Sequence, residues 1–145
     1  MRVYEVMTKA VETVKPAVLA SEARNMMRQK NIHHLVVTHG SELRGVVSER
    51  DLGGSKLPKT LGRWTVEDLM TAPVVTVTTR TPLRRAASLM KGRSIGSLVV
   101  TSANGKVAGI VTVADLLDLI AARPDHQSNK ELRRARARND EAWDE

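Results

Sequence analysis

The stretch GVVSERD (residues 45–51) returns downstream as GIVTVAD (residues 109–115). In both copies a glycine and two apolar residues precede a Ser or Thr, and an Asp follows three positions after that hydroxyl residue. The apolar residues predict the end of a buried strand. The S/T-x-x-D spacing predicts a helix start, where the hydroxyl and the carboxylate cap free backbone N–H groups. A motif that occurs twice at this length indicates an internal repeat.

The repeat extends through most of the chain, and the matched positions lie 63 or 64 residues apart. Upstream of GVVSERD and GIVTVAD, the matching stretches are VYEVMT (3–8) with VEDLMT (66–71), VETV (11–14) with VVTV (74–77), and NIHHLVVT (31–38) with SIGSLVVT (94–101). Agreement in the same order over this length supports a duplicated unit of roughly 60 residues, a size at which a single copy would be only marginally stable.

Each copy predicts the same series of elements. A helical turn ending in Met-Thr is followed by a short strand, a helix, two strands joined by a tight turn, and a closing helix that begins at Ser48 or Thr112. We expect the first closing helix to be short because Gly53-Gly54 follows it. The predicted fold is therefore mixed α/β (α+β), with two β-α-β-β-α repeats packed around a pseudo-twofold axis.

Changes in composition suggest the boundaries of the repeats. The first repeat takes residues 1–60 with the start of a Gly-, Pro- and Lys-containing linker, and the second takes residues 61–122. Residues 123–145 form a charged tail with six Lys or Arg and six Asp or Glu. We expect this tail to be disordered or to form a loosely docked helix, because its apolar residues are too few for a convincing buried face.

The composition excludes several classes of protein. The 145 residues contain no cysteine, which excludes disulfide scaffolds, thiolate metal sites and cysteine nucleophiles. The formal charge of +7 suggests anionic partners such as nucleotides, but an aromatic content of 2% counts against single-stranded nucleic acid. No apolar run reaches membrane-spanning length, and the first residues lack the apolar core of a signal peptide. We therefore expect a cytoplasmic protein without a membrane partner.

The duplicated motifs, taken in order, resemble the cystathionine-β-synthase (CBS) domain, and the pair resembles a Bateman module over residues 3–122. The resemblance implies a regulatory module that binds AMP, ADP or ATP in clefts between the repeats, with S-adenosylmethionine or NAD as further candidates. It implies no required cofactor and a homodimer of CBS pairs. We expect a stand-alone module that acts in trans on a separate protein target.

The resemblance also implies which residues bind the ligand. The two Asp side chains would accept hydrogen bonds from ribose hydroxyls, as an ionised carboxylate does well, and the Ser/Thr of each motif would contact ribose or phosphate. Residues before the buried strands would line the adenine pocket, and threonines of the first strands would add polar contacts. The implied residues are Thr13, Ile32, His34, Ser48, Asp51, Thr76, Ile95, Ser97, Thr112 and Asp115.

A phosphate group would also need basic side chains. The candidates in the sequence are Arg50, Arg80, Arg84, Arg85 and Arg93. We expect most of these arginines to lie on the solvated surface rather than in the cleft, because arginine is mostly exposed in folded proteins.

Metal binding and catalysis are not expected. His33 and His34 are adjacent and so point to opposite faces of a strand, which is unsuited to binding one metal ion. Asp115 and Asp118 lie three residues apart on the last helix, where a cap and a solvated carboxylate are favoured over a catalytic pair. No nucleophile elbow, zinc motif or phosphate loop is present, so we expect no enzymatic activity.

An alternative function remains open at this point. The basic body and the stretch KELRRARAR (130–138) could serve a protein-interaction or nucleic-acid-binding protein. The scarcity of aromatic residues makes nucleic acid the less favoured of these partners.

Overall fold

The computed structural model describes residues 1–53 and 63–122. Its elements are η1 (Val3–Glu5), β1 (Thr13–Val14), α1 (Ala20–Lys30), β2 (His34–His39), β3 (Glu42–Ser48), α2 (Val66–Leu69), β4 (Thr76–Thr78), α3 (Leu83–Arg93), β5 (Ser97–Thr101), β6 (Val107–Thr112) and α4 (Val113–Ala121). Two three-stranded sheets have the orders β1-β2-β3 and β4-β5-β6. In each, the first strand is parallel to the second and the last two strands are antiparallel. The predicted mixed α/β fold of two repeats is confirmed.

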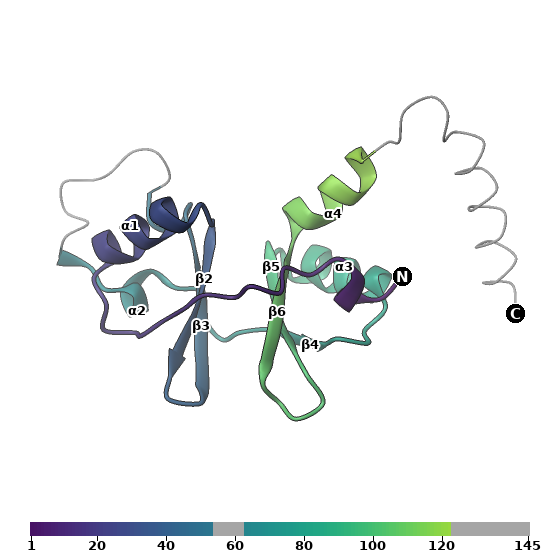
Figure 1. The fold of residues 1–145 in the computed structure, drawn as a ribbon, viewed down its shortest axis with the longest axis horizontal. Coiled ribbons are helices and arrows are strands. Elements are labelled where there is room, and N and C mark those ends of the chain that lie inside the picture. Colours follow the sequence, from purple (N-terminus) through teal and green to yellow (C-terminus); the bar gives the residue numbers. More distant parts are fainter. Residues whose placement is uncertain (54–62, 123–145) are drawn as a thin grey trace, which may run out of the picture.

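The two sheets stand side by side, with α1 and α3 on their outward sides (Figure 1). An apolar cluster that includes Val36 and Val46 from the first repeat and Val99 and Ile110 from the second joins the repeats. These residues are 0–6% exposed, and they form repeat-matched pairs. The same positions of the two copies therefore build the contact between them, as the predicted pseudo-twofold arrangement requires.

The helical turn that opens each repeat packs against the other repeat. Val3 belongs to the core of the second sheet, where its N–H donates to the carbonyl of Thr81 at 2.9 Å. Val66 belongs to the core of the first sheet, and its N–H donates to the carbonyl of Val18 at 2.8 Å. In Figure 1 the purple N-terminal segment accordingly begins beside α3, and α2 lies beside α1. Each apolar core therefore contains a segment of the other repeat. The expected boundaries at residues 60 and 122 follow the repeats of the sequence rather than these cores.

Gly45 and Gly109, the first residues of the duplicated motifs, allow the Met-Thr segments to pack against the other repeat. A Cβ atom at Gly109 would lie 2.7 Å from the carbonyl oxygen of Thr8, and one at Gly45 would lie 2.9 Å from that of Thr71. Both distances are shorter than a real Cβ atom tolerates. The exchanged Met-Thr segments therefore need glycine beneath them, because only glycine lets another backbone approach so closely.

The end of the first repeat differs from the prediction. After Ser48 the chain forms hydrogen-bonded turns rather than a helix: the N–H of Leu52 donates to the carbonyl of Ser48 at 3.3 Å, and the N–H of Gly53 to that of Arg50 at 3.0 Å. Gly53 adopts a φ of 93°, which a helix cannot continue through. The second closing helix, α4, begins after Thr112 as predicted.

Other predictions concern parts of the chain outside the described residues. They are the course of the linker from Gly54 to residue 62 and the state of the tail, residues 123–145. Over residues 1–53 and 63–122, no helix combines the length and the apolar character that crossing a membrane requires.

Candidate functional site

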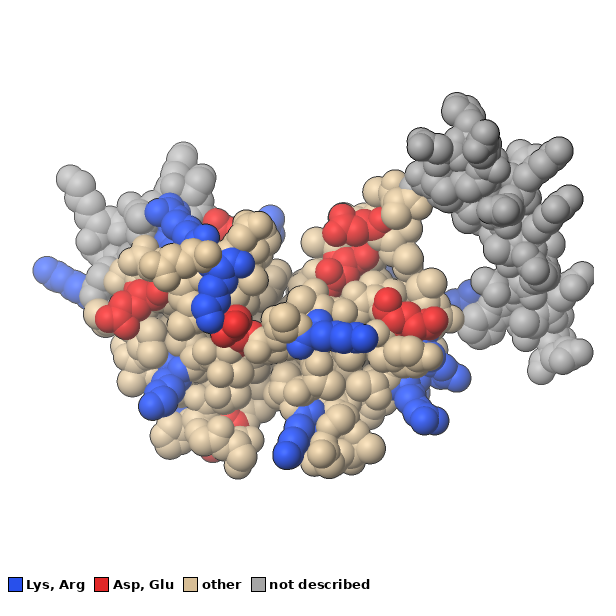
Figure 2. All heavy atoms as spheres, viewed as in Figure 1, with Lys and Arg blue, Asp and Glu red and all other residues tan. Residues whose placement is uncertain are grey.

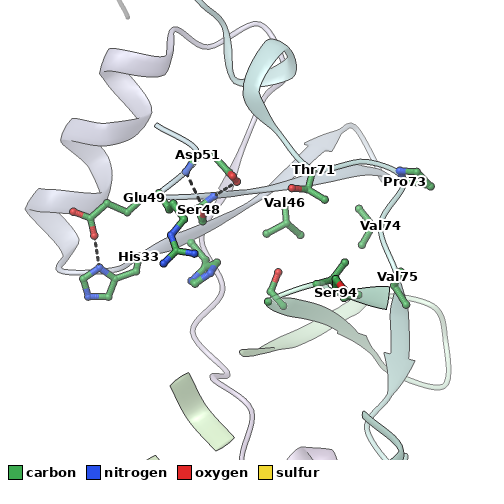
Figure 3. Close-up of a pocket in the computed structure, with 15 residues that line it drawn as sticks. His33, Val46, Ser48, Glu49, Asp51, Thr71, Pro73, Val74, Val75 and Ser94 are labelled. Carbon is green, nitrogen blue, oxygen red and sulfur yellow. Dashed lines mark hydrogen bonds and ion pairs between the residues drawn. The ribbon is translucent and has the colours of Figure 1, made fainter. Parts of the chain in front are cut away.

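The GVVSERD turn borders a cleft of about 470 Å³ between the repeats, here called the Asp51 cleft (Figure 3). The first repeat contributes the Ser48–Asp51 turn, and the second contributes the segments around Val74 and Ile95. Its lining includes His33, His34, Val46, Ser48, Glu49, Arg50, Asp51, Thr71, Val74, Val75, Ile95 and Ser97.

A second cleft of about 360 Å³, here called the Asp115 cleft, lies at the GIVTVAD motif. Here the second repeat contributes the start of α4, and the first contributes the segments around Val11 and Ile32. Its lining includes Thr8, Val11, Glu12, Ile32, His33, His34, Val36, Ile110, Thr112, Ala114, Asp115 and Asp118.

The two clefts are built crosswise. Asp51 of the first repeat shares its cleft with Ile95 of the second, and Asp115 of the second repeat shares its cleft with Ile32 of the first. Each cleft therefore combines the polar motif of one repeat with the apolar pocket of the other. The sequence predicted both sets of residues, but local patterns could not show which members face each other.

Each motif forms a reciprocal capping box. The N–H of Ser48 donates to Oδ2 of Asp51 at 2.9 Å, and the N–H of Asp51 donates to Oγ of Ser48 at 3.1 Å. Thr112 and Asp115 repeat this arrangement at 2.8 and 3.2 Å. Among the described residues, Oδ1 of neither Asp has a hydrogen-bond partner. A hydroxyl that accepts a hydrogen bond can also donate one, so the motif can cap the backbone and still bind a ligand.

A third capping box provides an internal comparison. Thr65 and Asp68 form the same reciprocal pair at the start of α2, yet neither residue lines either cleft. The backbone N–H of Thr65, and then its hydroxyl, hold the pKa of Asp68 below its usual value. The S/T-x-x-D spacing therefore makes a cap wherever it occurs, and the tertiary structure decides which caps border a cleft.

His34 lines both clefts, whereas its repeat-matched counterpart Ser97 lines only the Asp51 cleft. Burial lowers the pKa of His34 from its usual value of 6.5, and the neighbouring His33 lowers it further, while Asp115 and Asp51 oppose the shift. A lowered pKa leaves the ring neutral at pH 7, where it can both donate and accept hydrogen bonds.

His33, like His34, lines both clefts, but its ring already has a partner. Its ring is exposed, and Nδ1 pairs with Oε2 of Glu49 at 2.6 Å (Figure 3). In the part of the chain that the structure describes, no group of three or more His, Asp or Glu side chains is arranged to hold a metal ion.

Eight of the ten implied ligand residues line at least one of the clefts, and Thr13 and Thr76 do not. These two threonines are exposed on β1 and β4. Their predecessors Glu12 and Val75 line the clefts instead. Successive side chains of an extended segment point to opposite faces. The residue directly before each implied threonine therefore faces the cleft, and the threonine itself faces away.

Sequence reasoning missed several lining residues. Thr8 and Thr71 belong to the duplicated Met-Thr stretches, and this repetition was the signal that could have identified them. Of the candidate arginines only Arg50 lines the Asp51 cleft or the Asp115 cleft, next to Asp51. Asp118, expected to be solvated, is exposed but lines the Asp115 cleft.

A duplicated unit whose copies share two crosswise clefts defines a ligand-binding repeat module. The family model of the CBS domain matches residues 3–52 and 66–122. The chain belongs to the CBS domain family, as the sequence motifs predicted. CBS pairs are regulatory modules that bind ligands.

One similar protein is a much longer enzyme. Homoserine O-acetyltransferase of Methanohalobium evestigatum is 33% identical over 119 residues, which are 81% of this chain but 24% of that enzyme. The chain thus spans about a quarter of that relative.

Two solved structures are similar in fold and contain adenosine compounds. The CBS domain pair of protein MJ0100, in complex with 5′-methylthioadenosine and S-adenosyl-L-methionine, matches with a TM-score of 0.72 at 25% identity, covering 86% of this chain and 98% of that one. The cytosolic domain of the Mg²⁺ channel MgtE, in complex with ATP, matches with a TM-score of 0.62 at 30% identity, covering 79% and 46%.

Proposed function

We propose that this protein is a regulatory sensor that binds adenosine-containing ligands in the Asp51 and Asp115 clefts and whose bound state is detected by a protein partner. AMP, ADP and ATP are the first candidates, and S-adenosylmethionine and NAD are further ones. The complexes of protein MJ0100 and of MgtE support this ligand class. The likeness to a cytosolic domain supports a cytoplasmic setting.

The observation that carries the proposal is the second oxygen of each motif Asp. Oδ2 completes the capping box, while Oδ1 has no partner among the described residues, in a cleft with an apolar side. Ribose hydroxyls would donate to the Asp carboxylate, and adenine would lie against apolar residues such as Val74 and Ile95 in the Asp51 cleft. Charge-assisted hydrogen bonds of this kind are the strong ones.

The crosswise construction supports regulation rather than storage of the ligand. A ligand in the Asp51 cleft touches the motif of the first repeat and the apolar pocket of the second. Binding therefore favours the conformations in which the two repeats hold that spacing, and the shift is limited by the difference in affinity between conformations. We propose no catalytic role for either cleft.

Calorimetric titration with AMP, ADP, ATP, NAD and S-adenosylmethionine tests the proposal. We expect the wild type to bind at least one of them at or below millimolar concentration. Asp51→Asn and Asp115→Asn should each weaken binding in their own cleft about tenfold or more, because a hydrogen bond to a charged group contributes about 1.5–3 kcal/mol. The amide keeps an oxygen for the cap but places donors opposite the ribose donors.

Matched variants separate binding from folding. Asp51→Ala removes the cap as well, and should lower stability by about 1 kcal/mol in addition to the loss of binding. Asp68→Asn changes the capping box outside the clefts, and should leave binding unchanged. Absence of binding to all five compounds at millimolar concentration would overturn the proposed function. Binding that survives in the Asp51→Asn/Asp115→Asn double variant would overturn the assignment of the site.

We further propose that two copies of the module pair through α4. Its residues Val113, Leu117 and Ile120 lie on one face and are 41%, 59% and 71% exposed, and α4 extends from the body in Figure 1. The apolar face of an amphipathic helix is normally buried against another part of a protein. Sedimentation analysis should show a dimer for the wild type and a monomer for Leu117→Lys, and a monomeric wild type would contradict the pairing.

The alternative of a protein-interaction or nucleic-acid-binding protein that uses the basic body and the stretch KELRRARAR stays a prediction, and that stretch lies outside the described residues. Salt dependence distinguishes the two functions, because binding to a phosphate backbone collapses steeply as salt rises.

A further inference from the structure

The two clefts differ in charge at positions that the repeats match. Arg50 lines the Asp51 cleft, and the matched position in the Asp115 cleft is Ala114. Glu12 lines the Asp115 cleft, and the matched position in the Asp51 cleft is Val75. The clefts thus share one construction, but at two matched positions their lining side chains differ in charge. Both differences favour an anionic ligand in the Asp51 cleft over the Asp115 cleft.

Asp118 increases the difference. It lines the Asp115 cleft one helical turn after Asp115 on α4, and Figure 2 shows acidic side chains along this helix. With Glu12, three carboxylates border this cleft, and none of its described lining residues is Lys or Arg. Lys30 Nζ pairs with Oε2 of Glu12 at 2.8 Å, but Lys30 is outside the lining and offsets only part of the charge.

The Asp51 cleft has a more favourable balance for anions. Its lining contains two carboxylates, and that of Glu49 is already paired with the His33 ring at 2.6 Å. Arg50 is exposed at the same turn. A guanidinium group presents several donors in a geometry that matches phosphate.

Three backbone donors at the start of α4 are already used within the protein, as are those of Ser48, Glu49 and Asp51 in the matched turn, so backbone donors do not distinguish the clefts. A helix N-terminus can attract an anion through its free N–H groups. Here the N–H of Thr112 donates to Asp115, that of Val113 donates to the carbonyl of Gly96, and that of Asp115 donates to Thr112. These donors are therefore occupied before any ligand arrives.

We propose that the clefts divide the adenosine ligands by charge: the Asp51 cleft takes a phosphate-bearing nucleotide, and the Asp115 cleft takes a phosphate-free adenosine compound, neutral or cationic, such as a thioether or sulfonium nucleoside. This inference rests on the proposed function and assigns a ligand class to each cleft. A phosphate in the Asp115 cleft would meet carboxylates without an arginine, whereas a sulfonium group would be attracted to them.

Variants with a single working cleft test the division. Asp115→Asn leaves the Asp51 cleft, and Asp51→Asn leaves the Asp115 cleft. Each is titrated with AMP, 5′-methylthioadenosine and S-adenosylmethionine. We expect AMP to bind the Asp51 cleft at least about tenfold more tightly than 5′-methylthioadenosine, and the order to reverse in the Asp115 cleft. Added salt should weaken the binding of AMP and leave that of 5′-methylthioadenosine nearly unchanged.

Exchanging the matched residues should move the preference. Arg50→Ala in the Asp115→Asn background should weaken AMP binding about tenfold, and Ala114→Arg in the Asp51→Asn background should strengthen it by a similar factor. Binding of 5′-methylthioadenosine should change less than about threefold in both cases. Arg85→Ala, on a helix away from the clefts, is the matched control and should change neither affinity.

The outcomes separate this inference from the proposed function. Equal ratios of AMP to 5′-methylthioadenosine affinity in the two clefts would overturn the division by charge while adenosine binding itself stands. The same holds if the Arg50 and Ala114 variants leave the ratios unchanged although thermal unfolding shows that they are folded. Failure of the wild type to bind any adenosine compound would overturn the proposed function, and the division with it.

Discussion

Replacing Gly109 with Ala should destabilise the protein although it adds a single methyl group. The new Cβ atom would lie 2.7 Å from the carbonyl oxygen of Thr8, where ordinary contact begins at 3.4 Å. Thr8 would therefore have to move by about 0.7 Å. This movement would stretch the two backbone hydrogen bonds between Thr8 and Ile110, which measure 2.9 and 3.1 Å.

The expected cost follows from these contacts. Each lost backbone hydrogen bond costs about 1 kcal/mol net, and overpacking costs about 1–3 kcal/mol. The lower entropy of the unfolded alanine chain returns about 0.4–1 kcal/mol. We therefore expect Gly109→Ala to lower the free energy of unfolding by about 2–4 kcal/mol, measured by urea denaturation. Since Thr8 lines the Asp115 cleft, ligand affinity there should fall more than in the Asp51 cleft.

Gly92 provides the matched control within the same chain. It lies in α3, and a Cβ atom added there would meet nothing within 4 Å. Gly92→Ala should therefore stabilise the protein by up to about 1 kcal/mol through helix propensity. If Gly109→Ala were as stable as the wild type while Gly92→Ala behaved as expected, the reasoning about close approach at the motif glycine would be refuted.

Two further substitutions test the core and the cleft. Val3→Ala removes a side chain that is 0% exposed in the core of the second sheet, so it should cost about 2 kcal/mol. Hydrogen exchange should quicken more in β4–β6 than in β1–β3, and the reverse order would contradict the exchanged packing. His34→Gln should flatten the loss of stability on acidification. Because the pKa of His34 is lowered from 6.5, its contribution is present above that pH and is lost as the pH falls through the folded value. Urea denaturation from pH 7.5 to 5 measures this, and an unchanged slope would contradict it.

Much of the fold could be predicted from local patterns. The duplicated motif, the apolar runs and the capping spacings depend on residues a few positions apart, and they were enough to predict the two repeats. The cleft residues came from the family resemblance, and eight of the ten that it implies line a cleft. The first closing helix was wrong over the described residues, because Gly53 ends the turn there with a positive φ. Thr13 and Thr76 were displaced by one position from the observed lining.

The remaining features depend on contacts between residues about sixty positions apart. Local spacing can show that Ser48 and Asp51 cap a turn, but not that their cleft is completed by Ile95 rather than by Ile32. The first helical turn of each repeat lies in the core of the other repeat, and the two sheets pack through a shared apolar cluster. The sequence contains the charge differences, Arg50 against Ala114 and Glu12 against Val75, but only the tertiary structure places Arg50 in one cleft and Glu12 in the other.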